Sequence, residues 1–242
     1  MITKTLALLA LAVVTTTAQA GTSAPAKGVI APTIEPESAI SYSNISLSKQ
    51  YASGKLGATQ LPINNIELDL EGFALALEYS PADNLYLALG VSRSEVKAKF
   101  PGGGFLPFPI DFEVGDYWAV NTGIGGFIPL TKNIHFVTEL GANYAVLFSS
   151  LQSLGASPAS DASDWGFYAI PHIRAQFGKF ETHVGASYTT SDTATSEWNG
   201  FLRLLYAATP ELDLFVTGSF GLADSARIQD FQGVNFGLRY KF

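Results

Sequence analysis

The sequence of 242 residues contains no cysteine, and only 14% of its residues are charged. Without cysteine, the chain can form neither a disulfide framework nor a thiolate metal site. Soluble domains usually carry about a quarter of charged residues, so the low charge indicates that much of the surface faces something other than water. The 21 acidic residues outnumber the 14 basic ones, and we therefore expect no nucleic-acid partner.

Residues 1–20 have the three parts of a secretory signal peptide. Lys4 supplies the positive start, residues 6–14 form a short apolar stretch, and residues 18–20 (AQA) are a small-residue cleavage site. A membrane anchor is disfavoured because small residues follow at once. No later apolar run is long enough for a transmembrane helix. Residues 21–38, rich in Pro, Ala and Ser, predict an extended periplasmic tail, and residues 39–242 form the remaining domain, which is either soluble in the periplasm or a barrel.

From residue 40 onward, large apolar side chains recur at every second position, which is the period of a β-strand. Between Phe73 and Tyr79, for example, they alternate with Ala74, Ala76 and Glu78. This pattern predicts ten strands, at residues 40–51, 66–79, 85–99, 115–128, 133–148, 165–177, 180–190, 197–208, 212–222 and 231–242.

The predicted connections alternate between short turns and longer loops, which is typical of a transmembrane barrel. The second face of the strands carries mostly Gly, Ala, Ser, Asn and Tyr, which suits a narrow lumen better than a surface in water. Lipid also excludes open sheet edges. The fold class predicted is therefore all-β, an antiparallel up-and-down transmembrane β-barrel. Aromatic residues near the strand ends suit its interfacial girdles: Tyr79, Trp118, Tyr144, Trp165, Tyr188, Trp198, Tyr206 and Tyr240.

The C-terminal residues 234–242 (VNFGLRYKF) end in alternating apolar residues and a terminal Phe. This ending resembles the assembly signal of outer-membrane barrels, carried here by Tyr240 and Phe242. The turns at 80–85 (SPADNL), 130–134 (LTKNI) and 209–212 (TPEL) resemble those of the small proteobacterial OmpA/OmpX-like barrels, the "porin family". The resemblance implies a location in the Gram-negative outer membrane and a transient partner, the barrel-insertion machinery. Smaller members of this group have eight strands, which is the alternative to ten.

Three histidines bear on catalysis: His135, His172 and His183. The resemblance implies that enzymes on such barrels, proteases and lipid A hydrolases, carry their catalytic residues near the outer rim. A nucleophile there needs a nearby base, and the predicted topology puts the three histidines near the periplasmic end. We therefore predict no enzyme, no catalytic residues, no cofactor and no metal. His172 and His183 could hold a metal, but the hairpin more readily pairs His183 with Arg174.

Charged residues at lumen-facing positions gather in the predicted periplasmic half. Two interpretations stand, a charged constriction that selects small solutes and an interior ion-pair network that fills a narrow barrel; the second is favoured. The predicted cluster consists of Glu78, Glu139, His172, Arg174, Glu181, His183, Arg203 and Arg239.

The second and third strands continue beyond their apolar stretches with charged residues on the same face. A tight hairpin around Ala82 would place Glu71 opposite Arg93, Glu67 opposite Lys97, and Asp69 opposite Glu95. Charges on the lipid face are costly at mid-membrane, so they should lie at head-group level. There Arg93, Lys97 and Lys99 are predicted to contact lipopolysaccharide phosphates, and a solvated strand extension is the alternative.

Two of the predicted longer loops have a distinctive composition. Residues 100–112 (FPGGGFLPFPIDF) are apolar and could bind a partner surface or fold over the barrel mouth, whereas residues 149–163 suggest a flexible loop. The favoured function is a non-enzymatic outer-membrane barrel, either envelope-structural or a weak small-solute pore. A surface adhesin acting through extracellular loops and a lipid- or peptide-hydrolase are the alternatives. The sequence leaves the oligomeric state open.

Overall fold

The computed structural model describes residues 40–56, 66–100, 108–149, 162–190, 198–222 and 228–242. The predicted signal peptide and tail, and most of the two loops discussed above, lie outside these residues. Within them, no helix is long and apolar enough to cross a membrane.

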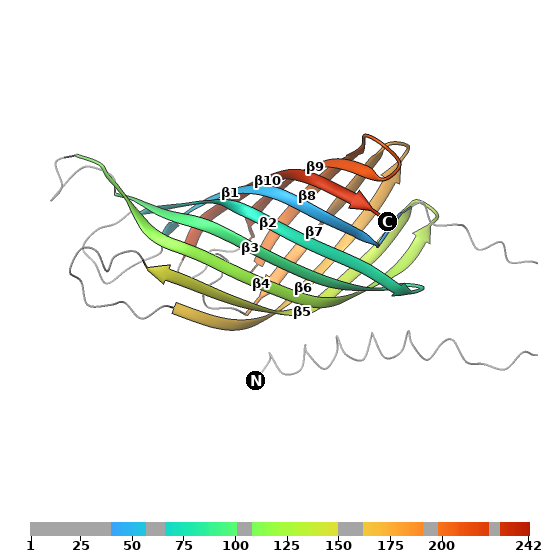
Figure 1. Ribbon diagram of the computed structural model, residues 1–242, viewed down its shortest axis with the longest axis horizontal. Coiled ribbons are helices and arrows are strands. Elements are labelled where there is room, and N and C mark those ends of the chain that lie inside the picture. Colours follow the sequence, from blue (N-terminus) through green and yellow to red (C-terminus); the bar gives the residue numbers. More distant parts are fainter. Residues whose placement is uncertain (1–39, 57–65, 101–107, 150–161, 191–197, 223–227) are drawn as a thin grey trace, which may run out of the picture. The chain divides into compact units, whose positions relative to one another are not determined.

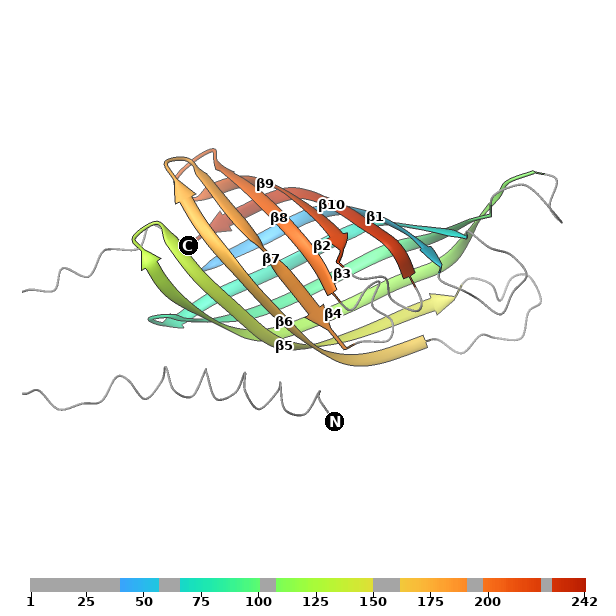
Figure 2. The ribbon, with the colours of Figure 1, turned by 180° about the vertical axis from the view of Figure 1, so that it is seen from behind.

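Ten antiparallel strands form a closed barrel in which each strand pairs with its neighbours in sequence and β1 pairs with β10. The fold class and the count of ten are confirmed, and the alternative of eight strands is wrong. Figures 1 and 2 show the strands running obliquely around the barrel. The strands are β1 (Asn44–Leu56), β2 (Glu67–Ala82), β3 (Leu85–Phe100), β4 (Ile110–Thr131), β5 (Ile134–Ser149), β6 (Ala162–Phe177), β7 (Phe180–Thr189), β8 (Trp198–Ala207), β9 (Leu212–Gly221) and β10 (Ile228–Lys241).

Large apolar side chains point outward along every strand. Leu47, Phe73 and Phe167 are 54%, 58% and 72% exposed, whereas the intervening positions turn toward the interior. A soluble protein rarely exposes so wide an apolar surface, and a closed barrel leaves no unpaired strand edge in lipid. The outer face of this barrel is therefore a lipid-facing surface.

Short turns lie at one end of the barrel, which also holds the end of β10 and the C-terminus (Figure 1). Asn84 in the β2–β3 turn and Gly178 in the β6–β7 turn have φ angles of 62° and 61°, a conformation that Asn and Gly tolerate better than other residues. Phe242 donates its backbone N–H to the Ser43 carbonyl, 3.1 Å away, beside the β1–β10 seam. In outer-membrane barrels the short turns face the periplasm, so we call this the periplasmic end.

Three strand boundaries differ from the prediction by four or five residues, and one of them is the end of β1, which lies at Leu56 instead of residue 51. β4 begins at Ile110, five residues earlier than expected, because it continues past a bulge to pair with the end of β3. β1 begins only at Asn44, because residues 40–43 leave the wall of the barrel. Ile40 and Tyr42 are instead buried inside it.

The predicted register of the β2–β3 hairpin is wrong by two residues. Glu71 lies opposite Glu95, Asp69 opposite Lys97, and Glu67 opposite Lys99. The turn lies at Asp83 and Asn84 instead of around Ala82, and an irregularity between Tyr79 and Ala82 takes back one residue of the resulting displacement. A shift of two keeps every side chain on its predicted face, so the faces are as predicted and only the partners change.

Candidate functional site

A carboxylate on β7, Glu181, is the centre of a buried charge network inside the barrel. Its Oε1 accepts hydrogen bonds from Arg174 Nε at 2.9 Å, Arg174 Nη2 at 2.7 Å and His183 Nε2 at 2.7 Å. Arg239 Nη2 donates to its Oε2. Charge-assisted hydrogen bonds are the strong ones, and here two cations and an imidazole converge on one carboxylate.

The network extends to β9 through Asp213, which is 2% exposed. Its carboxylate accepts from Arg239 Nε at 2.7 Å and from Lys241 Nζ at 2.9 Å. Because every strand involved places these residues within a few positions of its short-turn end, the contacts form a layer there. We call Arg174, Glu181, Asp213 and Arg239 the lower network.

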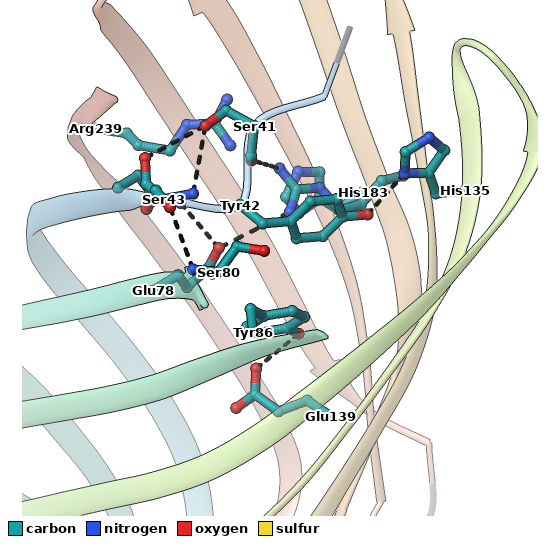
Figure 3. A network of polar contacts seen from close by, with 12 residues as sticks. Ser41, Tyr42, Ser43, Glu78, Ser80, Tyr86, His135, Glu139, His183 and Arg239 are labelled. Carbon is teal, nitrogen blue, oxygen red and sulfur yellow. Dashed lines mark hydrogen bonds and ion pairs between the residues drawn. The ribbon is translucent and has the colours of Figure 1, made fainter. Parts of the chain in front are cut away.

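Residues 40–43 cross the interior of the barrel near its periplasmic end. Tyr42 stacks on Phe127 of β4 at 3.9 Å between ring centroids, and its hydroxyl hydrogen-bonds with His135 Nδ1 of β5 at 3.0 Å (Figure 3). The Arg174 guanidinium of β6 lies 4.2 Å from the Tyr42 ring centroid and donates to the Ser41 carbonyl at 3.0 Å. Since β4, β5 and β6 are not neighbours of β1, this segment spans the lumen, and we call residues 40–43 the N-terminal plug.

The three histidines are all held by polar contacts within this end of the barrel. His135 bonds with Tyr42, His183 donates to Glu181, and His172 Nδ1 lies 3.2 Å from the Ile170 carbonyl. The rings of His172 and His183 stack at 5.6 Å. In the described part of the chain, no three metal-ligating side chains come together.

Further from the short-turn end, Glu139 on β5 accepts hydrogen bonds from two tyrosines. Tyr168 donates to its Oε1 at 2.8 Å and Tyr86 to its Oε2 at 3.0 Å, the latter drawn in Figure 3. The Tyr86 ring lies directly over Gly125, where any Cβ would overlap it. Glycine at this position therefore lets the tyrosine reach Glu139.

Arg203 on β8 is the cross-strand partner of His183 on β7 and of Thr217 on β9. Its Nε donates to Thr217 Oγ1 at 2.9 Å, and its guanidinium carbon lies 5.0 Å from the Phe215 ring centroid. Glu139 and Arg203 both keep part of their surface exposed, unlike the members of the lower network.

All eight predicted luminal residues face the interior, and the structure brings Arg174, Glu181, His183 and Arg239 into direct contact. Glu78 joins them at 3.8 Å from Arg174 and accepts from Asn44 at 2.9 Å. His172 stacks at its edge, whereas Glu139 and Arg203 remain outside it. Sequence reasoning missed Asp213 and the plug. A signal for the plug was present, since Ile40 and Tyr42 are large apolar residues at inward positions that are otherwise small or polar.

On the outer face, the basic residues predicted to meet lipopolysaccharide each pair with a carboxylate. Arg93 donates to both oxygens of Asp116, at 3.2 and 3.1 Å. The Nζ atom of Lys97 lies 3.2 Å from Glu95 Oε1, and the Nζ atom of Lys99 lies 2.5 Å from Asp69 Oδ2. The predicted pairs of Arg93 with Glu71 and Lys97 with Glu67 do not form, because of the shifted register.

No protein-family model matches the sequence, and no curated protein sequence matches it significantly. Among solved structures, an outer membrane channel from Pseudomonas putida F1 is similar, with a TM-score of 0.51 and 12% identity over 88% of this chain and 100% of that one. The translocator domain of the autotransporter NalP from Neisseria meningitidis has a TM-score of 0.44 and 10% identity, over 84% of this chain and 91% of that one. Outer membrane phospholipase A from Escherichia coli has a TM-score of 0.38 and 11% identity, over 89% of this chain and 95% of that one.

Similarity at such low identity concerns the fold. The closed ten-stranded barrel with its lipid-facing surface is an outer-membrane β-barrel, and its location is the cell outer membrane. The similarity is to this general class and does not single out the OmpA/OmpX-like group. A barrel of this kind hosts many unrelated activities, so the function must come from the site.

Proposed function

We propose that this protein is a non-enzymatic outer-membrane barrel with a lumen closed at its periplasmic end, which supports the envelope and lets small solutes pass slowly at most. The observation that carries the proposal is the N-terminal plug seated on the lower network. Tyr42 is 4% exposed and Arg174 is 2% exposed, so neither water nor solute has free access past them. Paired charges of this kind serve to hold a structure, because buried charge is tolerated mainly when paired.

The burial of two of the three histidines supports the absence of an enzyme. A general base must reach the proton of its nucleophile or water, whereas His183 is enclosed against Glu181 and His135 against Tyr42. Both residues are also buried. Their hydrogen bonds are used to fix the lower network and the plug.

Planar-bilayer recordings of the purified full chain test the proposal. The wild type should show small conductance or none. Tyr42→Ala should increase it, because the substitution removes the ring that packs between Phe127 and Arg174, whereas Tyr42→Phe keeps the ring and should conduct as the wild type does. Large porin-like steps in the wild type would contradict the proposal, as would identical recordings from all three proteins.

We also propose lipopolysaccharide as a partner on the outer face of β2 and β3. A hollow of about 560 Å³ there is lined by Lys97, Lys99, Tyr51 and neighbouring residues. Because these lysines are already paired, phosphate must compete with Asp69 and Glu95 or join them through a divalent cation. Replacing Arg93, Lys97 and Lys99 with Gln should reduce the thermal stabilisation by lipopolysaccharide, and Lys179→Gln in a periplasmic turn is the control. If lipopolysaccharide stabilised the triple variant as much as the Lys179→Gln control, this contact would be contradicted.

Membership of the OmpA/OmpX-like group and recognition by the barrel-insertion machinery are further proposals, supported by the C-terminal strand. β10 carries Tyr240 and ends beside Phe242, both of which are exposed on the outer face. Deleting Phe242 should lower the amount of heat-modifiable barrel in the outer membrane. Normal levels of folded protein in this variant would count against the proposed signal.

A further inference from the structure

The ring of Tyr42 is enclosed by four side chains of the barrel wall. It stacks on Phe127 at 3.9 Å between ring centroids and lies 5.4 Å from the ring of Tyr86. The Arg174 guanidinium lies 4.2 Å from its centroid, and its hydroxyl hydrogen-bonds with His135 Nδ1 at 3.0 Å (Figure 3). Tyr42 is only 4% exposed, so these four residues, which we call the tyrosine recess, surround a phenol ring almost completely.

The residues of the tyrosine recess are held by contacts with the rest of the barrel. Arg174 donates to Glu181 from Nε at 2.9 Å and from Nη2 at 2.7 Å. The Tyr86 hydroxyl donates to a carboxylate of β5 at 3.0 Å. Phe127 and His135 belong to the paired strands β4 and β5, and their rings lie parallel at 5.3 Å. The shape of the recess therefore does not depend on Tyr42.

The N-terminal plug lies outside the β-ladder. The pairing of β1 with β2 and with β10 begins at Asn44, so withdrawing residues 40–42 breaks no pair of that ladder. Ser43 stays tied to the wall, because its carbonyl accepts the Phe242 N–H at 3.1 Å and its Oγ accepts the Ser80 N–H at 3.2 Å. Residues 40–42 can thus leave the recess while the barrel remains closed around it.

The tyrosine recess contacts a second polar group of the plug besides the hydroxyl. The carbonyl of Ser41, which directly precedes Tyr42, accepts a hydrogen bond from Arg174 Nη2 at 3.0 Å. Aromatic rings gain from offset stacking and from a nearby cation, and the two hydrogen bonds fix the orientation of the ring. A free molecule with a phenol ring and an acyl carbonyl at the same spacing would make the same contacts.

We propose that the tyrosine recess is a binding site for small phenols that carry an acyl carbonyl, and that the plug is its displaceable occupant. The ligand ring stacks on Phe127, its hydroxyl bonds with His135, and its carbonyl accepts from Arg174. Because the plug is tethered, its effective concentration at the recess is of millimolar order, and a free phenol must compete with it. The proposal rests on the plug of the proposed function and names the ligand class of its seat.

Isothermal titration of the purified full-chain variant Tyr42→Ala, which lacks the occupying ring, tests the site. N-acetyltyramine reproduces the tyrosine side chain together with the preceding carbonyl. It should bind roughly tenfold more tightly than p-cresol, which cannot accept from Arg174, and p-cresol should bind roughly fivefold more tightly than toluene, which cannot bond with His135. His135→Phe added to Tyr42→Ala should abolish the difference between p-cresol and toluene.

The wild type should bind N-acetyltyramine at least tenfold more weakly than Tyr42→Ala does, because the plug competes. Tyr206→Ala is the matched control, since it removes a tyrosine that is exposed on the outer face. It should bind as the wild type does, and it also reports uptake of the phenols by detergent.

Three results would overturn the proposal. Equal affinities of Tyr42→Ala for p-cresol and toluene would show an unspecific apolar gap, and equal binding by Tyr42→Ala and Tyr206→Ala would place the phenol elsewhere. No binding of N-acetyltyramine to the wild type up to the solubility limit would show that the plug is not displaced, and this measurement does not depend on any variant folding. Conductance of the wild type, measured separately, decides the proposed function. A porin-like wild type that binds phenols would contradict only that function, and a closed barrel without phenol binding would contradict only this site.

Discussion

The interior of the barrel contains charged side chains that are satisfied in two different ways. At the periplasmic end, Arg174 and Arg239 share Glu181, and all three are nearly inaccessible to solvent. Glu139 and Arg203, by contrast, hydrogen-bond only with neutral hydroxyls and keep part of their surface exposed. The same residue types are thus held by ion pairs in the lower network and by neutral groups outside it.

The largest expected effect comes from breaking the lower network at its centre. Glu181→Gln removes the negative charge that Arg174 and Arg239 share, which leaves Arg239 with only Asp213 and Arg174 with only Glu78, 3.8 Å away. Loss of one partner from a buried ion pair costs about 3–5 kcal/mol. Urea unfolding of the refolded barrel should show a loss of free energy in this range.

The matched control for this change is Glu95→Gln on the outer face, whose carboxylate pairs with Lys97 in an exposed position. Exposed ion pairs contribute little, so this variant should unfold close to the wild type. If Glu181→Gln were no less stable than Glu95→Gln, the lower network would not hold the barrel together.

A smaller effect is expected outside the lower network from Gly125→Ala. The new Cβ would overlap the Tyr86 ring, so the ring must move away from Glu139. Overpacking of this kind costs about 1–3 kcal/mol. Gly126→Ala is the control, since its Cβ would meet only the Asn84 carbonyl at an ordinary 3.7 Å. Equal unfolding curves for both variants would show that Tyr86 has another position available.

Much of this architecture follows from the sequence because its dominant signal is local. Apolar side chains at every second position define each strand and its lipid face, and the ten predicted strands all exist. The charges that reach the lower network were predicted for the same reason, since Arg174, Glu181 and Arg239 occupy inward positions near the ends of their strands.

Features that depend on contacts distant in sequence were not predictable in this way. The plug was assigned to the first strand, although Ile40 and Tyr42 put large side chains at its inward positions and Tyr42 contacts residues on β4, β5 and β6. The β2–β3 partners were wrong because the turn lies at Asp83 and Asn84 rather than around Ala82, which displaces the whole register. Nor does periodicity distinguish Arg203, which lacks an ion partner in the described chain, from Arg239, which has two.

The plug offers a finer test of the periplasmic end. Tyr42→Phe keeps the ring stacked on Phe127 and loses only the hydrogen bond with His135. A typical intramolecular hydrogen bond contributes about 1 kcal/mol, and the unfolding free energy should fall by that amount. His135→Phe is the reciprocal change, and the double variant should lose less than the sum if the two groups act on each other. Strict additivity would contradict a direct contact between them.

The smallest effect should come from Arg203→Gln. This change removes a charge that has no carboxylate partner in the described chain, so no ion pair is lost. A glutamine amide can still donate to Thr217, and the cost of holding a lone cation inside the barrel disappears. We expect the free energy of unfolding to change by less than about 1 kcal/mol, in contrast to Glu181→Gln in the lower network. A loss as large as that of Glu181→Gln would show that Arg203 stabilises the fold as Arg174 does, and the distinction between paired and unpaired interior charges would then be incorrect.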